Sequence, residues 1–166
     1  MNWLPYENYY IISPLSSDEV RLRLEKHVSP PFTGNFLRQL TNRYSTYYKG
    51  FVNNSEFKIE PIIEGRNSFI PQIAGNIKLA GSGSRIHIKM TLLEPVMIFI
   101  GIVSVFIGIA TIAALIDLMK SKHLEPAFLA PIGMMIFIYA LTIYGFTSES
   151  ISSKKFLLEL FEAEYE

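Results

Sequence analysis

The chain contains no cysteine. Disulfides, thiolate metal sites and cysteine nucleophiles are therefore excluded, and the composition fits a reducing compartment. An excess of positive charge is also missing, because fifteen basic residues balance fifteen acidic ones. We therefore expect no nucleic-acid partner. The first fourteen residues lack the basic start and the unbroken apolar core of a secretion signal. The N-terminal region is thus expected to stay in the compartment where it is made.

Charge is missing altogether from two long stretches. Residues 95–116 and 127–146 contain no Asp, Glu, Lys or Arg. The hydrocarbon core of a bilayer is about 30 Å thick, and about 20 helical residues span it. Both stretches meet that length. The sequence therefore predicts an integral membrane protein with a two-helix transmembrane hairpin over residues 92–147, and the lipid bilayer is its first expected partner.

The same two stretches contain no ionisable residue that is charged at neutral pH. Pumps and transporters usually need such side chains within the hydrocarbon, so neither class is expected. Gly101, Ser104 and Gly108 are small residues at helical spacing and allow close helix packing. That packing would lie either within the hairpin or between chains, as in a homo-oligomer or with a protein partner in the membrane. Glycine is also common in spans without any such role.

The preceding region, residues 1–91, is predicted to form a small β-rich domain. Its strand patterns combine aromatic and β-branched runs with alternation of apolar and polar side chains. The predicted strands cover residues 6–13, 47–52, 57–63, 73–79 and 86–90. The last two flank a short Gly/Ser loop and are expected to form a β-hairpin.

Helical signals in this region are fewer. Ser16 and Glu19 form a capping-box pattern, and Val20, Leu24 and Val28 follow on one face. This predicts a helix that ends before the prolines at 30–31. A short helix near residues 36–40 and a turn over residues 65–68 are further expectations.

Beyond the hairpin, residues 148–166 are predicted to form a separate, short C-terminal amphipathic helix. Thr147 to Ser153 is polar, and Phe156, Leu157, Leu160 and Phe161 then recur at helical spacing. This helix is expected either to pack on the domain or to lie at the membrane surface. The expected fold class is thus α+β: a small, mostly antiparallel β domain with one or two helices, a transmembrane hairpin and this last helix.

Basic residues flank the predicted spans. The last predicted strand leads almost directly into the first span, so the domain is expected to lie close to the bilayer. The residues expected at the membrane interface are Arg85, His87, Lys89, Lys154 and Lys155. Only Lys120 and Lys122 flank the connecting loop, and this difference favours both termini in the cytoplasm. A solvated strand face explains His87 equally well.

Motifs of catalysis or of metal binding are missing. His27, His87 and His123 have no ligand spacing, and the chain has no Gly-x-Ser-x-Gly motif. The Gly/Ser loop at residues 81–84 joins two strands, whereas common phosphate-binding loops precede a helix. Glu94 and Asp117 bracket the first span as ordinary interfacial residues. We therefore expect no enzyme, no cofactor and no metal site.

One segment carries a resemblance. Residues 65–75 contain Asn67-Ser68-Phe69-Ile70-Pro71 followed by a strand that ends on Gly75. Together with Lys49-Gly50-Phe51 and the basic strand at residues 85–90, this resembles a group of bacterial two-span membrane proteins of unknown function that have a small β-rich N-terminal domain. The resemblance implies a bacterial source and the inner membrane, and it implies no activity.

These patterns favour a non-enzymatic inner-membrane protein whose cytoplasmic domain is a binding or sensing module. Two alternatives remain open. One is an oligomerising membrane effector that forms a pore or disrupts the bilayer, of the toxin or phage-defence type. The other is an accessory subunit of a larger membrane complex.

Overall fold

The computed structural model describes residues 4–30, 47–62, 68–121 and 129–166. Its elements are β1 (Tyr6–Ser13), α1 (Ser17–Glu25), β2 (Val28–Ser29), β3 (Tyr48–Val52), β4 (Glu56–Pro61), β5 (Pro71–Ala80), β6 (Gly83–Leu92), α3 (Glu94–Ser121), α4 (Leu129–Phe161) and β7 (Glu164–Tyr165). The predicted helix near residues 36–40, the turn residues 65–67, Lys122 and His123 lie outside the described residues.

The strands form one sheet in the order β2-β3-β4-β5-β6-β1-β7. All neighbours are antiparallel except β2 and β3, which are parallel. The predicted hairpin is confirmed: β5 and β6 pair from Pro71↔Leu92 to Ala80↔Gly83. Gly81 opens the two-residue loop with a φ of +61°, a conformation that favours glycine at this position. The other predicted strands are confirmed within one or two residues at their ends.

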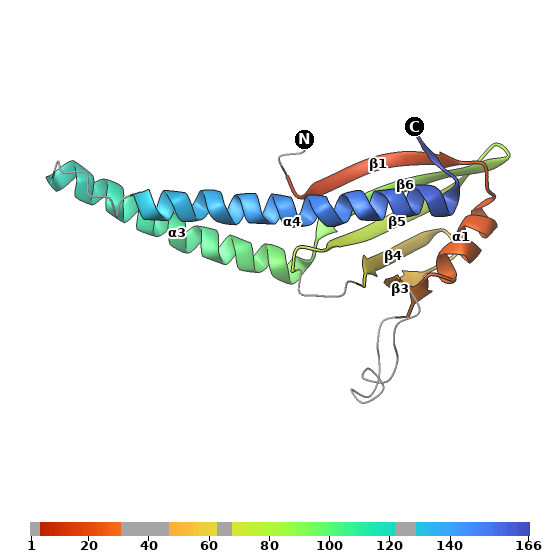
Figure 1. Cartoon of the computed structure of the whole chain (residues 1–166), viewed down its shortest axis with the longest axis horizontal. Helices are drawn as coiled ribbons and strands as arrows, with labels where there is room; N and C mark the ends of the chain where they lie inside the picture. Colours follow the sequence, from red (N-terminus) through yellow and green to blue (C-terminus); the bar gives the residue numbers. More distant parts are fainter. Residues whose placement is uncertain (1–3, 31–46, 63–67, 122–128) are drawn as a thin grey trace, which may run out of the picture.

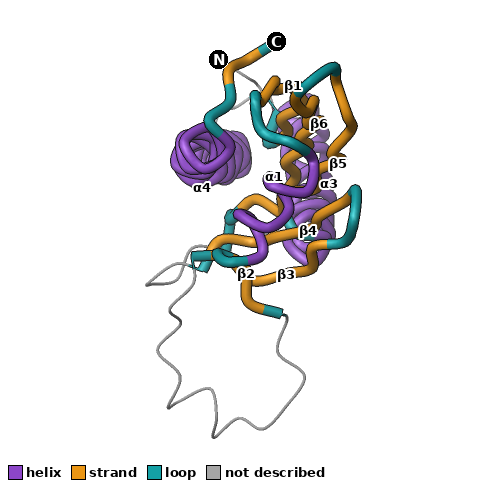
Figure 2. Tube along the Cα trace, turned by 90° about the vertical axis from the view of Figure 1, so that its right-hand side faces the viewer, coloured by secondary structure: helices purple, strands orange, loops and turns teal. Residues whose placement is uncertain are grey.

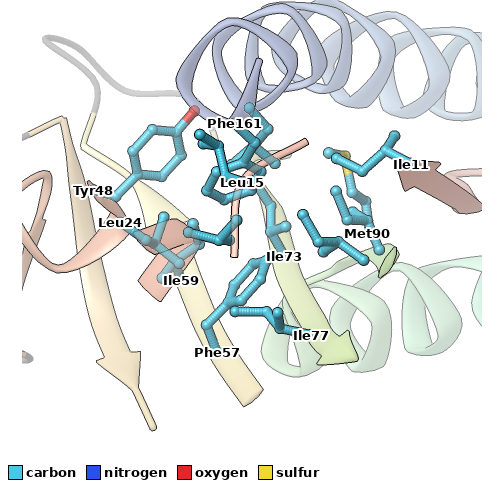
Figure 3. Close-up of a cluster of buried hydrophobic side chains, with 14 of the residues drawn as sticks. Ile11, Leu15, Leu24, Tyr48, Phe57, Ile59, Ile73, Ile77, Met90 and Phe161 are labelled. Carbon is cyan, nitrogen blue, oxygen red and sulfur yellow. The ribbon is translucent and has the colours of Figure 1, made fainter. Parts of the chain in front are cut away.

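The two faces of the sheet differ because side chains alternate along each strand. One face of β5 and β6 places Ile73, Ile77, Ile86 and Ile88 in the core. In Figure 2, α1 and α4 both lie on one side of the sheet. Figure 3 shows how the core side chains from the strands converge with Phe161 of α4. The opposite face is covered by none of the described elements.

The start of α1 follows the predicted cap. Glu19 N donates to the Ser16 hydroxyl at 3.3 Å, and Val20 and Leu24 are fully buried. The predicted end is wrong, because the helix stops at Glu25 and Val28 instead begins β2. His27 O accepts from Tyr48 N at 3.2 Å, so pairing with β3 begins there and competes with another helical turn.

The predicted separation of the second span from a C-terminal helix is wrong. Residues 129–161 form one continuous helix, α4, of 33 residues, which is about 50 Å long. Its polar segment, Thr147 to Ser153, contains neither proline nor glycine, so nothing interrupts the backbone hydrogen bonds. A single buried stripe runs along the helix and contains Thr142, Phe146, Ser150, Ser153, Leu157 and Phe161.

The helix ends at a defined place. Glu162 has a φ of +48°, and Ala163 N donates to Leu158 O at 2.9 Å, which is a typical left-handed helix end. Arg23 of α1 donates to the Glu162 carboxylate at 2.6 Å, and this hydrogen bond raises the pKa of Arg23. The chain then enters β7, which pairs with β1 at Ile11↔Tyr165. The C-terminal residues are therefore part of the sheet domain.

The helices α3 and α4 are each long and apolar enough to span a membrane, judged by length and composition. Only Leu93 separates β6 from α3. Figure 1 shows α3 and α4 side by side at one end of the molecule, while the rest of α4 runs along the sheet next to β1, β5 and β6. The expected order, a β-sheet domain followed by two long apolar helices, is thus confirmed.

Candidate functional site

The hairpin encloses an apolar crevice. A cavity of about 420 Å³ lies between α3 and α4 near residues 4–5, and its walls include Gly101, Ser104, Tyr139 and Thr142. An added Cβ at Gly101 or Gly108 would meet no described atom within 4 Å. Gly101 and Gly108 are therefore not in tight contact with α4. Contacts of this face with another chain stay a prediction.

A polar cluster joins α4 to β1 beyond the hairpin. Lys154 forms an ion pair with Glu7, and their side chains are only 21% and 14% exposed. Ser150 donates to the same carboxylate at 3.4 Å. Lys154 also lies over the ring of Tyr9, with its Nζ 5.2 Å from the ring centroid. Lys154, predicted at the membrane interface, is thus engaged inside the domain, whereas Lys155 is exposed on the other side of α4.

The hydroxyl of Tyr9 completes this cluster. It is buried and has no hydrogen-bond partner among the described residues. Burial, followed by the charges of Tyr165 and Glu7, raises the pKa of Tyr9 well above its ordinary value. The phenol therefore stays neutral in the folded protein under ordinary conditions. Sequence reasoning missed Glu7 and Tyr9, since only the pairing of β1 beside α4 brings them to Lys154.

The three basic residues predicted on β6 share the open face of the sheet. Arg85 forms an ion pair with Glu166 at 2.7 Å and lies over the ring of Tyr10, 4.1 Å from its centroid. His87 stacks on the same ring at 4.4 Å. Lys89 lies nearest to α3, and its Nζ is 5.6 Å from the ring centroid of Tyr6.

These three residues lie at different distances from the hairpin. The strand β6 runs along α4 (Figure 1), with Arg85 near the β5–β6 turn and Lys89 toward α3. At about 3.3 Å per residue, Arg85 lies roughly 30 Å along the chain from Glu94, where α3 begins. The position of Lys89 at the membrane interface stays a prediction, and the same position for Arg85 requires a strongly tilted sheet.

The same open face contains a concavity of about 480 Å³. Phe51, Lys58, Ala74 and Lys89 line it and stand in one row across β3, β4, β5 and β6. A second row contributes further polar side chains, from Glu56, Asn76 and His87. Sequence reasoning did not find this group, because outward residues on separate strands resemble ordinary solvated positions. The signal that unites them is the strand register.

Positive charge dominates this face. Lys49 pairs with Glu60 at 3.3 Å, and Arg85 pairs with Glu166. Lys58, Lys78 and Lys89 point from the same face and form no ion pair with a described residue. Glu56 instead accepts a hydrogen bond from Asn76 Nδ2 at 3.1 Å.

Within the described ranges, no three His, Asp or Glu side chains gather in a way that could hold a metal ion. The chain matches no protein-family model, no curated protein and no solved structure. The hairpin, the junction with α4 and the open face are therefore the features of the molecule that bear on its function.

Proposed function

We propose that this chain is a non-enzymatic membrane protein whose sheet domain is a binding or sensing module held at the bilayer by α3 and α4. The observation that supports this most is that one half of α4 has an exposed apolar surface while the other half packs in the sheet domain. Residues 129–146 expose large apolar side chains, such as Phe137 at 66%, which water does not favour and lipid does. Residues 147–161 of the same helix bury Leu157 and Phe161 in the domain core.

Sheet pairing supports the proposal that the two described ends of the chain lie on the same side of the membrane. β1 pairs with β7, and Glu166 N donates to Tyr10 O at 3.2 Å. If the hairpin crosses the bilayer, both ends lie on the side of the sheet domain. The excess of basic residues on that side favours the cytoplasm. With the resemblance to bacterial two-span proteins, we assign the chain to the bacterial inner membrane.

Cysteine labelling tests this topology directly, because the chain has no native cysteine. Lys58→Cys lies in the domain and Lys120→Cys lies at the far end of α3. A membrane-impermeant maleimide should label Lys58→Cys only in inside-out vesicles and Lys120→Cys only in spheroplasts. Phe137→Cys, in the middle of a span, should react only after detergent is added. Labelling of the first two variants from the same side, or release of the protein by carbonate, would contradict the proposal.

The rigid connection through α4 has its own test. Spin labels at Lys58→Cys and Lys120→Cys, measured by pulsed electron paramagnetic resonance in nanodiscs, should give one narrow distance distribution. Three glycines inserted after Thr147 should broaden it, because glycine favours unfolding of a helix interior. Insertion of three alanines is the matched control and should keep a narrow distribution. Equal widths for both insertions would show that α4 does not hold the domain in place.

The second candidate function is an oligomerising membrane effector. It is favoured by the open space at Gly101 and Gly108, where an added Cβ would meet no described atom within 4 Å. Mass measured in mild detergent distinguishes the two functions. A monomer or dimer agrees with an anchored module, whereas a large ring that Gly108→Leu disperses agrees with an effector.

A further inference from the structure

We propose that the open face of the sheet binds a small phosphorylated ligand with a planar ring. The phosphate lies over Ala74 between Lys58 and Lys89, and the ring lies against Phe51. This inference rests on the proposed function as a binding module, for which it names a ligand class.

The strand register builds the phosphate position. Lys58 pairs with Ala74, and Ala74 pairs with Lys89, so the two lysines flank one small residue on three adjacent strands. Neighbouring strands are about 4.8 Å apart, which separates the two lysine Cα atoms by about 10 Å. In the structure Lys89 Nζ lies 5.6 Å from the ring centroid of Tyr6 on β1, and rotation about its side-chain bonds brings it above the methyl group of Ala74, which Lys58 also reaches. Two ammonium groups can then contact a single phosphate.

Charge selects an anion at this position. Neither Lys58 nor Lys89 forms an ion pair with a described carboxylate. Glu56 lines the same cavity, where it accepts from the Asn76 amide, so two lysines are opposed by one carboxylate. Two like charges that approach each other repel, and a bound anion removes this repulsion. Lysine binds phosphate as a compact point charge, which suits two lysines that approach from opposite sides.

The aromatic wall selects a planar ring. Phe51 is adjacent to Lys58 through strand pairing and is 61% exposed, which is unusual for a large aromatic side chain without a partner surface. Stacking on such a side chain suits any flat heteroaromatic ring. Asn76 also lines the cavity, and its Oδ1 is buried without a hydrogen-bond partner among the described residues. The volume of about 480 Å³ lies within the usual range for small-molecule sites.

The direction of the face separates a soluble ligand from a lipid headgroup. β5 and β6 run alongside α4 (Figure 1), so in the proposed arrangement they follow the membrane normal. The open face then looks sideways into the aqueous compartment. Phe51 and Lys89 stand in one row across the strands, roughly 16 Å along the chain from Glu94. In that arrangement a headgroup in the bilayer surface lies below the whole row.

The test uses the full chain in phosphatidylcholine nanodiscs, with ADP and inorganic pyrophosphate as probes in isothermal titration calorimetry. Lys58→Gln and Lys89→Gln should each weaken both probes about tenfold, the usual loss for one charge-assisted hydrogen bond. Lys26→Gln is the matched control, since Lys26 is an exposed lysine at the end of α1, on the covered side of the sheet. It should bind both probes like the unchanged chain.

Phe51→Ala separates the ring from the phosphate. It should weaken ADP about tenfold, because base stacking is lost, and leave pyrophosphate unchanged. The proposal is overturned if ADP does not bind at millimolar concentration, or if the two lysine variants bind it unchanged. It is also overturned if inositol trisphosphate binds more tightly than ADP and ignores Phe51→Ala, since the occupant would then be a lipid headgroup. The cysteine-labelling results do not depend on any ligand, so failure here leaves the proposed membrane topology intact.

Discussion

The two halves of α4 have the same backbone and very different surfaces. Residues 129–146 expose apolar side chains in nearly every direction, whereas residues 147–161 bury one stripe and expose polar residues such as Ser152 and Lys155. A helix in lipid needs no polar face, while a helix on a sheet domain in water needs both faces. The change occurs near Phe146 without any break in the helix. The composition of each half of α4 therefore reflects the surroundings of that half, although the helix is continuous.

The largest expected effect on stability distinguishes the two halves of α4 by removal of one phenylalanine ring from each. Phe161→Ala removes a fully buried ring that packs near Phe57, and it should lower the free energy of unfolding of the domain by about 3–5 kcal/mol. Phe137→Ala removes an exposed ring from the other half and should change it by less than about 0.5 kcal/mol. Urea unfolding in detergent, followed by circular dichroism, measures both. Equal losses would show that the part of α4 around Phe137 also belongs to the domain core.

A charged residue should have the opposite pattern: for membrane insertion, a substitution in residues 129–146 should matter more than one in residues 147–161. Phe137→Lys places an ammonium group in the proposed span and should disfavour insertion by about 3 kcal/mol. Ile151→Lys is the matched control, because Ile151 is exposed on the second half. The fraction of protein that resists carbonate extraction measures insertion. If Ile151→Lys lowered that fraction as strongly, the change of surroundings would not lie near Phe146.

The ion pair of the second half offers a smaller effect. Lys154→Met leaves the Glu7 carboxylate largely buried with only Ser150 as a described hydrogen-bond partner. Breaking a fully buried pair costs about 3–5 kcal/mol, and the partial exposure of this pair reduces the expected loss to about 2 kcal/mol. Adding Glu7→Gln to Lys154→Met should recover part of the lost free energy of unfolding.

Lys155→Met, one residue further along α4, is the control for this experiment. Lys155 is exposed and its nearest carboxylate, that of Glu159, is 3.9 Å away, so its loss should be close to zero. The same urea unfolding measures all four proteins. Equal losses for Lys154→Met and Lys155→Met would mean that the cluster with Glu7 does not hold α4 on β1.

The smallest effect is visible only in alkali. In the unfolded chain Tyr9 ionises near pH 10, whereas burial raises its pKa in the folded protein. Its contribution to stability is therefore complete below pH 10 and falls above it, by about 1.4 kcal/mol at pH 11. Tyr9→Phe should remove this share of the alkaline loss and change little at neutral pH. An unchanged pH profile would show that the phenol reaches water. Tyr48, whose pKa is also raised by burial, keeps its own share in both proteins.

Local patterns were sufficient where one segment determines its own structure. The alternation in β5 and β6 needs only its own hairpin loop, and the start of α1 needs only Ser16 and Glu19. The continuity of α4 was missed because Thr147 to Ser153 is polar, which usually marks a loop. Ser150 and Ser153 are nevertheless buried, four and seven residues after Phe146. The spacing of these serines with Leu157 and Phe161 was the available signal.

The candidate binding site was less accessible from the sequence. Phe51, Lys58 and Lys89 come from three strands, and no short-range pattern relates them. Their alignment depends on the register of β3 to β6, which is set by packing of the opposite face. A register shift of one residue would turn each of these side chains into the core. The site is therefore a property of the assembled sheet.

The shared helix α4 has a mechanical consequence for the domain. A transmembrane helix adapts to a thinner bilayer by tilting further from the membrane normal. Residues 147–161 tilt with it, because the helix is continuous. Leu157 and Phe161 are packed in the core of the sheet domain, so the sheet tilts as well. In the proposed arrangement, bilayer thickness thus sets the inclination of the whole domain, and with it the direction from which a molecule in solution approaches Phe51.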